Sequence, residues 1–395
     1  MERHILCINS GSSSIKFALF QMVPAEKLLA EGAVERIGIP GGQLWLKDGR
    51  GTSLADRHEA FRDHNAAIKA MLTAAMEDQH LPAPDAVGHR LVHGGPKHTG
   101  PEMVTPELLT VLRDLVPLAP LHLPSEIRAI DAVTAHYPKL NQVACFDTAF
   151  HRTIPEVAQR LPLPRTFWHE GIRRYGFHGL SYEYIVTTLG EAVRGRMIVA
   201  HLGNGASMAA LKDGRPQDTT MGFSATGGLM MGTRSGDLDP GILLYLMYEK
   251  GFDASSLENL LDKHAGLVGV SGISPDMKTL LDQRDKEPHA AEAVELFCYT
   301  ARKFIGALAA VLGGLDSLVF TGGIGERAGP VRWMICHGLD HLGIRLDPHQ
   351  NDADAAVISS KDSPCMVRVI STNEDLMIAR HTQRLLFPGS EGEKA

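Results

Sequence analysis

The chain has 395 residues, a net charge of −7 at pH 7, and a globular composition with 44% hydrophobic and 22% charged residues. A chain of that length exceeds the size at which one hydrophobic core keeps growing, so two domains are expected. The acidic balance has no basic block, which argues against nucleic acid or a membrane as partner. Five scattered cysteines and the lack of an apolar run of about 20 residues predict a reduced cytoplasmic protein.

The first predicted element is a hairpin. Residues 5–8 are apolar, residues 9–14 form a small-residue turn, and residues 15–20 are apolar again. The turn NSGSSS, with Lys16 close behind it, offers close backbone approach, N–H donors and a cation, as phosphate binding requires. It lacks the P-loop spacing and precedes a strand instead of a helix. A phosphate-binding turn and a plain serine-rich turn both remain open.

Three segments of the middle region carry polar groups where chemistry is expected. A helix is predicted over 59–78, and residues 88–95, GHRLVHGG, then place Arg90 between two histidines. Asp147 directly follows the apolar run 142–146, and strand ends of α/β sheets are frequent ligand sites; a cap for the next turn is the alternative. His178 lies between two glycines in RYGFHG, where a solvated loop histidine is the competing interpretation.

A strand, turn and strand pattern returns about half a chain later. Residues 197–202 and 208–211 are apolar around the turn HLGNGAS, in which Asn204-Gly205 is also a common hairpin signal. The repeat predicts an α/β fold of two domains with like topology. In the loop MGTRSGDLDPG that follows, Asp239 before Pro240 is typical of a helix start, whereas Arg234 has no evident structural reason.

The last third predicts a long helix over 290–312, a strand over 317–321 and a final helix over 373–386. After the strand, Gly322, Gly323, Ile324 and Gly325 fit a nucleotide pocket at a helix start, and also the weaker Rossmann fingerprint. Thr372 and Asp375 have capping-box spacing, and Glu374 either complements the helix dipole or holds a Mg²⁺ water. His337 and His341 are interpreted as a solvated helix face, since no third zinc ligand is apparent.

Seven segments in this order resemble the acetate kinase family, which includes propionate and butyrate kinases, within the superfamily of actin, sugar kinases and heat-shock ATPases. They are NSGSSSIKF, GHRLVHGG, FDTAFH, RYGFHG, HLGNGAS, MGTRSGDLDPG and TNED, and they span residues 9–375. The resemblance implies two ribonuclease-H-like domains with an active-site cleft between them. It divides the chain into residues 1–150 and a nucleotide-binding domain of residues 151–373, with a helix of about 374–387 packing back on the first domain.

The resemblance also implies an activity: reversible, in-line transfer of the γ-phosphoryl group of ATP to acetate, giving acetyl phosphate and ADP, in a homodimer. Mg²⁺, or Mn²⁺ in its place, would be held by Asn9 and Glu374. The catalytic residues would be Arg90, Asp147, His178 and Arg234. The acyl pocket would involve Arg90, Val92, Leu121 and Ala225. The nucleotide would contact Ser12, Ser14, Lys16, His201, Leu202, Gly203, Asn204, Gly205, Asp276, Met277, Lys278, Gly322, Gly323, Ile324 and Gly325.

Departures from the family pattern affect the acid and the nucleotide. Ala225 stands where a proline is common, which widens the acyl pocket toward propionate. Residues 274–278 read SPDMK where relatives read SSDFR, and Arg327 replaces the asparagine that ends the usual GIGEN. Leu180 and Tyr182 replace a threonine and a histidine. A propionate kinase is therefore the alternative within the family. A Rossmann-type dehydrogenase and a non-catalytic actin-like ATPase are the alternatives outside it.

Overall fold

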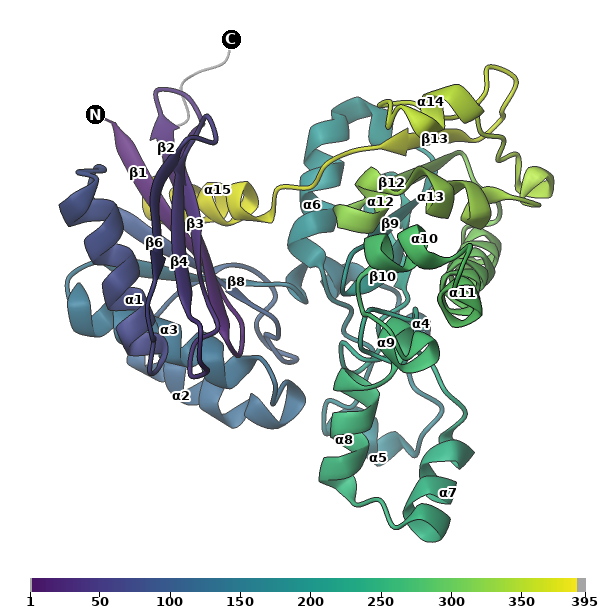
Figure 1. Cartoon of the computed structure of the whole chain (residues 1–395), viewed down its shortest axis with the longest axis horizontal. Helices are drawn as coiled ribbons and strands as arrows, with labels where there is room; N and C mark the ends of the chain where they lie inside the picture. The colour runs from purple at the N-terminus through teal and green to yellow at the C-terminus, as the bar shows by residue number, and fades with distance from the viewer. Residues whose placement is uncertain (1, 389–395) are drawn as a thin grey trace. The chain divides into compact units, whose positions relative to one another are not determined.

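A computed structural model describes residues 2–388 as an α/β protein, drawn in Figure 1. The chain divides into two compact units. The first contains the described residues up to Phe150 and those from Asn373 onward, and the second contains His151–Thr372. Each unit is built around one β-sheet. Among residues 2–388, no helix is long and apolar enough to cross a membrane.

The first unit has an eight-stranded sheet in the order β5-β4-β3-β2-β1-β6-β8-β7, counted over the described residues. Its strands are β1 Arg3–Ser10, β2 Ser14–Val23, β3 Lys27–Glu35, β4 Gln43–Asp48, β5 Ser53–His58, β6 Ala86–Leu91, β7 Glu102–Met103 and β8 Asn141–Phe146. Strands β1, β6 and β8 run parallel, whereas β1 to β5 form an antiparallel meander. The predicted hairpin at the start of the chain is confirmed as β1 and β2.

Helices cover both faces of this sheet. They are α1 His64–Leu72, α2 Pro106–Asp114, α3 Leu123–His136 and α15 Glu374–Leu386. In Figure 1, α1 and α3 lie together on one face, and α15 lies on the other against β1, β2, β6 and β8. Strand β1 is therefore covered on both sides, and its residues Ile5–Ile8 are almost fully buried. This double burial explains why β1 reads as an uninterrupted apolar run.

The second unit has a five-stranded sheet in the order β11-β10-β9-β12-β13, again over the described residues. Its strands are β9 Arg196–Leu202, β10 Ala206–Lys212, β11 Arg215–Thr219, β12 Ser317–Thr321 and β13 Met366–Val369. An antiparallel run β11-β10-β9 is followed by the parallel strands β12 and β13. The segment β3-β2-β1-β6-β8 of the first sheet has the same order and directions. The predicted fold of two similar α/β domains is confirmed.

The second unit is rich in helices, and α11 is the longest. The helices are α4 Glu156–Gln159, α5 Arg165–His169, α6 Gly179–Leu189, α7 Pro240–Lys250, α8 Ala254–Lys263, α9 Gly266–Ser271, α10 Met277–Gln283, α11 Pro288–Leu312, α12 Gly322–Arg327, α13 Gly329–Cys336 and α14 Pro348–Asp352. Helix α11 packs on β9, β10 and β11 and ends at Gly313, whose φ of 72° is left-handed. The predicted long helix and the Asp239 cap of α7 are both confirmed.

Shorter helical turns complete the chain, and three local predictions were wrong. These turns are η1 Thr73–Asp78, η2 Val116–Leu118, η3 Ala149–Thr153, η4 Gly190–Val193 and η5 Asp340–Leu342. The helix expected over 59–78 begins only at His64, because Asp63 caps it, and its last turn is π-helical. Helix α15 is capped by Asn373 rather than by Thr372. His337 and His341 do not share a helix, since one ends α13 and the other lies in η5.

Candidate functional site

Arg90 and Asp147 form an ion pair at the carboxyl ends of two parallel strands. Arg90 lies near the end of β6, and Asp147 directly follows β8, its parallel neighbour. One carboxylate oxygen of Asp147, Oδ2, accepts from Nη2 of Arg90 at 2.6 Å and from Nε at 3.0 Å. The Asp147 side chain is 1% exposed and that of Arg90 is 18% exposed. The parallel register thus brings together two predicted site residues that are distant in the sequence.

Two further predicted residues reach the same guanidinium. Oδ1 of Asn9, on β1, lies 3.4 Å from Nη1 of Arg90, and Oε2 of Glu374, at the start of α15, lies 3.6 Å from Nε. Burial by itself would lower the pKa of Arg90, but Asp147 and Glu374 outweigh it and raise that pKa above its usual value. Arg90 therefore stays charged. Four segments of the chain meet at one cation, which we call the Arg90 cluster: Asn9, Arg90, Asp147 and Glu374.

The donor set of the Arg90 cluster fits a hard divalent cation. Asn9 offers an amide oxygen and Glu374 a carboxylate oxygen, and Mg²⁺ prefers oxygen ligands. The described residues contain no group of three or more His, Cys, Asp and Glu side chains that would enclose a metal ion by themselves. Mg²⁺ keeps several waters and is commonly held by one or two protein oxygens together with substrate phosphate.

The serine-rich turn connects β1 and β2 and is fixed by the backbone. Gly11 donates its N–H to the carbonyl of Ser14 at 2.7 Å, and Nε2 of the buried His64 lies 2.8 Å from the Gly11 carbonyl oxygen. Ser12 is exposed and Ser14 is half-buried. Lys16 is also exposed, and it pairs with Asn9 across the hairpin. The turn thus presents hydroxyl groups and a cation to its surroundings next to the Arg90 cluster.

In the second unit, His178 is held by a network of side chains. It precedes α6 with a left-handed φ of 57° and is 9% exposed, which rules out a solvated loop histidine. Its Nδ1 lies 2.8 Å from Oγ of Ser207, and the Tyr182 hydroxyl lies 2.5 Å from that same Oγ. The ring also stacks on His201 with centroids 4.3 Å apart. Tyr182, which departs from the family pattern, is therefore part of the support of His178.

Gly205 brings Arg234 and His178 close to one another. A Cβ atom on Gly205 would lie 2.6 Å from Nη2 of Arg234 and 3.3 Å from Nε2 of His178. Nη1 of Arg234 donates to the carbonyl oxygen of Ala225 at 2.7 Å, which fixes the guanidinium. Only glycine leaves space for both side chains here. A guanidinium and an imidazole thus converge on the backbone of the turn between β9 and β10.

The remaining glycine-rich segments also surround this turn. The N–H of Gly232 donates to the Asn204 carbonyl at 2.9 Å, and a Cβ on Gly232 would clash with the Asn204 side chain and approach the Pro275 carbonyl. Gly322, at φ 74°, lies against the backbone of Leu202. Gly322 to Gly325 form the first turn of α12 directly after β12, which confirms the predicted helix start at this segment.

The SPDMK segment has a structural role that the sequence did not show. Asp276 caps α10, accepting from the N–H and the hydroxyl of Thr279. Its neighbour Met277 is buried, whereas Lys278 is exposed. Asp276 is exposed as well, so Asp276 and Lys278 are the two of these three predicted residues that a ligand could contact.

The predicted acyl-pocket residues are divided between the two units. Val92 is buried just beyond β6, Leu121 is half-buried before α3, and Ala225 is half-buried in the second unit. Glu126, which was not predicted, is 3% exposed, and its Oε2 accepts from the Val92 N–H at 3.1 Å. Leu123, Glu126, Ile127 and Ile130 have helical i, i+3, i+4, i+7 spacing, so a carboxyl group at a core position was the signal for it.

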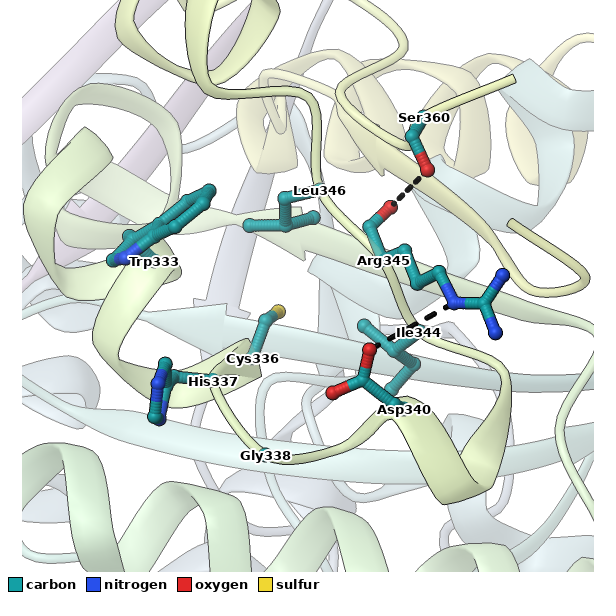
Figure 2. Close-up of a pocket in the computed structure, with 9 residues that line it drawn as sticks. All are labelled: Trp333, Cys336, His337, Gly338, Asp340, Ile344, Arg345, Leu346 and Ser360. Carbon is teal, nitrogen blue, oxygen red and sulfur yellow. Dashed lines mark hydrogen bonds and ion pairs between the residues drawn. The ribbon is translucent and has the colours of Figure 1, made fainter. Parts of the chain in front are cut away.

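A separate cavity of about 470 Å³ lies in the second unit, shown in Figure 2. It is lined by Trp333, Cys336, His337, Gly338, Asp340, Ile344, Arg345, Leu346 and Ser360, none of which is a predicted site residue. Arg345 is already paired, with Asp340 at 3.7 Å and with Asp362 at 2.9 Å. No converging polar group in this lining indicates a ligand.

Comparison with known proteins gives a consistent result. The family model described as "Acetokinase family" matches residues 4–380. An acetate kinase of Rhodopseudomonas palustris is 48% identical, covering 98% of this chain and 100% of its own. The crystal structure of Porphyromonas gingivalis acetate kinase matches with a TM-score of 0.88 and 38% identity, over 97% of this chain and 100% of that one. A propionate kinase structure from Francisella tularensis matches with a TM-score of 0.92 and 35% identity, over 97% and 99%.

Proposed function

This chain belongs to the acetokinase family, and from that premise we propose that it is an acetate kinase, which reversibly transfers the γ-phosphoryl group of ATP to acetate. The Arg90 cluster is the observation that carries the proposal. In it, three motif residues remote in sequence surround the charged guanidinium of Arg90. A nucleotide-dependent scaffold needs phosphate-binding turns but does not need a buried arginine such as Arg90 to bind a second, anionic substrate.

Charge neutralisation, not proton removal, is the chemical problem for such an enzyme. A carboxylic acid with a pKa of about 4 to 5 is ionised at neutral pH, so its oxygen can attack phosphorus without a general base. Repulsion between two anions opposes the attack. Arg90 offsets the charge of the acetate, and Asp147, whose Oδ2 receives two bonds from Arg90, orients that guanidinium. We therefore assign Asp147 to positioning rather than to base catalysis.

The second unit supplies the groups for the transferring phosphoryl. Arg234 and His178, which meet at Gly205, would donate hydrogen bonds to its equatorial oxygens, where charge is spread in a loose transition state. The Ser207 hydroxyl, itself bonded by the Tyr182 hydroxyl, lies 2.8 Å from Nδ1 of His178, and in this proposal Nε2 is the nitrogen that faces the phosphoryl group. The backbone of residues 202–205 would approach the phosphates of the nucleotide.

The metal and the nucleotide are assigned in the same way. Mg²⁺, or Mn²⁺, would bind through Asn9 and Glu374 and offset phosphate charge, and Ser12, Ser14 and Lys16 would lie beside the phosphates. The adenosine would lie by α12 and the start of α10, with Gly323, Ile324 and Lys278 accessible to it. Thus the second unit would hold the nucleoside while the first unit would hold the acid.

Propionate is the second candidate substrate. The observation that favours it is Ala225, whose carbonyl fixes Arg234 and whose side chain is smaller than the proline common there. The Francisella tularensis match is, by its title, a propionate kinase. Val92 and Leu121 would complete an apolar pocket, and a pocket distinguishes acids that differ by one methylene by only about 10- to 200-fold. We therefore expect acetate and propionate both to be accepted.

We also propose that the chain is a cytoplasmic homodimer. Helix α7 has no buried residue, although it is largely apolar, and five of its large apolar side chains are between 43% and 80% exposed: Ile242, Leu244, Tyr245, Met247 and Tyr248. A helix that leaves several large apolar side chains exposed in its own chain is typical of an interface. A second copy is the partner that the family resemblance implies.

The test is to trap acyl phosphate with hydroxylamine after mixing the enzyme, Mg·ATP and acetate, propionate or butyrate. We expect acyl hydroxamate from acetate and propionate. Arg234→Ala should lower turnover by about a hundredfold or more while the fold is retained, because a transition-state donor is lost. Folded enzyme that yields no hydroxamate from any acid would remove the proposal, and ATP hydrolysis without acid dependence would favour the actin-like ATPase. Near-normal turnover of Arg234→Ala would refute its role.

A further inference from the structure

Glu126 is a buried carboxyl group next to the Arg90 cluster, and no step proposed above uses it. It lies in the first turn of α3, with its side chain 3% exposed. Both of its oxygens face the N–H of Val92, at 3.1 and 3.3 Å, and that single donor is its only polar partner among the described residues. Val92 follows Arg90 by two positions and lies directly after the last residue of β6. A change at Glu126 is therefore transmitted to the strand end that carries Arg90.

One N–H donor does not compensate for burying a full negative charge, because buried carboxylates need several donors or a paired cation. Burial raises the pKa of Glu126 to about 8, opposed by the Val92 N–H and by Arg90, and reinforced by Asp147. The charged groups that act on Glu126 itself are Arg90 on β6 and Asp147 after β8. Two further charges lie on α3: Arg128 acts on His64 of α1, and Asp131 pairs with Arg113 of α2.

We propose that Glu126 is a positioning residue whose side-chain carboxyl group stays protonated in the state of the enzyme that binds acetate. The inference rests on the proposed function and concerns the same site. Its basis is the geometry: an enclosed carboxyl with one donor, bonded to the backbone of a predicted acyl-pocket residue. Glu126 itself does not touch the reacting atoms. It acts through Val92 and through the charge that Arg90 can offer.

The charge balance around Arg90 explains why the proton matters. Its single positive charge already faces Asp147 at 2.6 Å and Glu374 at 3.6 Å. Loss of the Glu126 proton adds a third carboxylate charge to this cluster, in a site that must accept an anionic substrate. Binding of acetate and binding of the proton are therefore linked, and each strengthens the other by the same factor. Acetate affinity falls as pH rises through the titration range of Glu126.

The experiment compares the wild-type chain with Glu126→Gln, which keeps an oxygen acceptor for the Val92 N–H but cannot ionise. KM for acetate and kcat are measured from about pH 6.5 to about pH 9, a range in which acetate itself is fully ionised. The ratio of wild-type KM to variant KM should rise roughly fivefold across this range, with kcat changing less. ATP titrates equally in both reactions, so the ratio cancels its contribution. Glu59→Gln, at an exposed position of the same unit, is the matched control for net charge and should follow the wild type.

A second readout does not depend on catalysis. In full-length protein labelled with [δ-¹³C]glutamate, one carboxyl resonance should titrate near pH 8, and it should be missing from Glu126→Gln. Coinciding KM profiles in the two proteins would overturn the inference, as would a Glu126 carboxyl that titrates near pH 4. Wild-type protein that forms no acyl phosphate at any pH would instead contradict the proposed function, and the resonance would still show whether Glu126 keeps its proton.

Discussion

At the scale of single residues, Gly205 is the position where the smallest change has the largest expected effect. An added methyl carbon would lie 2.6 Å from Nη2 of Arg234, far inside van der Waals contact, and 3.3 Å from Nε2 of His178. The backbone of Gly205 has no positive φ, so alanine fits its conformation. The cost of the substitution therefore falls on the two functional side chains and not on the fold.

We predict that Gly205→Ala lowers kcat by about a hundredfold, because Arg234 must leave its position, while the melting temperature changes by only a few degrees. Steady-state kinetics and calorimetry would measure this. Gly306→Ala is the matched control, since a Cβ there meets nothing within 4 Å. It lies inside α11, where alanine should add about 1 kcal/mol of stability and leave kcat unchanged. Wild-type turnover in Gly205→Ala would contradict the convergence of Arg234 and His178.

Glu126 makes a second residue-scale prediction, about stability. The pKa of Glu126 is raised to about 8 in the folded state, whereas it is about 4.5 in the unfolded chain. The protonated carboxyl therefore contributes fully to the free energy of unfolding below about pH 4.5, and this contribution is lost as the pH rises through about 8. Glu126→Gln should therefore match the wild type near pH 4 and exceed it by a few kcal/mol above about pH 8. The free energy of unfolding in urea, measured for both proteins across pH, tests this sign. A difference that does not change with pH would refute it.

At the scale of elements, both hairpins and the long helix were predictable from sequence because they depend on local chemistry. Apolar runs bounded by glycine and serine turns gave β1-β2 and β9-β10, and helical periodicity ending at Gly313 gave α11. The start of α1 was not predictable, because Glu59 to Arg62 have no feature that excludes a helix. The true cap of α15 was also missed, since Thr372 and Asn373 are both good caps and only backbone geometry separates them.

For the candidate site, too, the sequence identified some features and missed others. Motif residues such as Arg90 and Asp147 were identifiable, because the motifs of this chain match those of the family residue by residue. Their pairing was not, because it depends on β6 and β8 being parallel neighbours in register. Glu126 was missed for a related reason: a carboxylate in the first turn of a helix normally complements the dipole in solvent. Burial is a tertiary property, and composition does not reveal it.

The cap of α15 gives a prediction at this scale. The Asn373 side chain accepts from the N–H of Leu376 at 2.9 Å, and the next residue is Glu374. Asn373→Ala should cost about 1 kcal/mol in stability and should also raise the Mg²⁺ concentration needed for half-maximal activity, because Glu374 loses its fixed position. Thr105→Ala removes the equivalent cap of α2 in the same unit. The control should lose similar stability with an unchanged Mg²⁺ requirement, and an equal Mg²⁺ effect in both would argue against the role of Glu374.

At the scale of the whole molecule, α7 determines the expected assembly. Leu244 is 53% exposed and Tyr248 is 80% exposed, although both belong to a helix with mainly apolar residues. A carboxylate at either position would lose its hydration in a dimer, and this desolvation costs more free energy than apolar packing at the interface provides. We predict that the double variant Leu244→Glu, Tyr248→Glu has half the wild-type mass by light scattering. Val157→Glu, at an apolar residue that is 84% exposed on α4, should leave the mass unchanged.

Helix α15 has a consequence for how the protein comes to be active. The ribosome makes β1 and β2 long before α15, yet these elements pack together in one unit, and the residue that opens α15, Glu374, reaches Arg90. A nascent chain that has emerged as far as β13 has every strand of both sheets and still lacks one carboxylate of the cluster. Phosphoryl transfer is therefore expected only after α15 has been translated, so termination before α15 yields an inert fragment and not a partly working kinase.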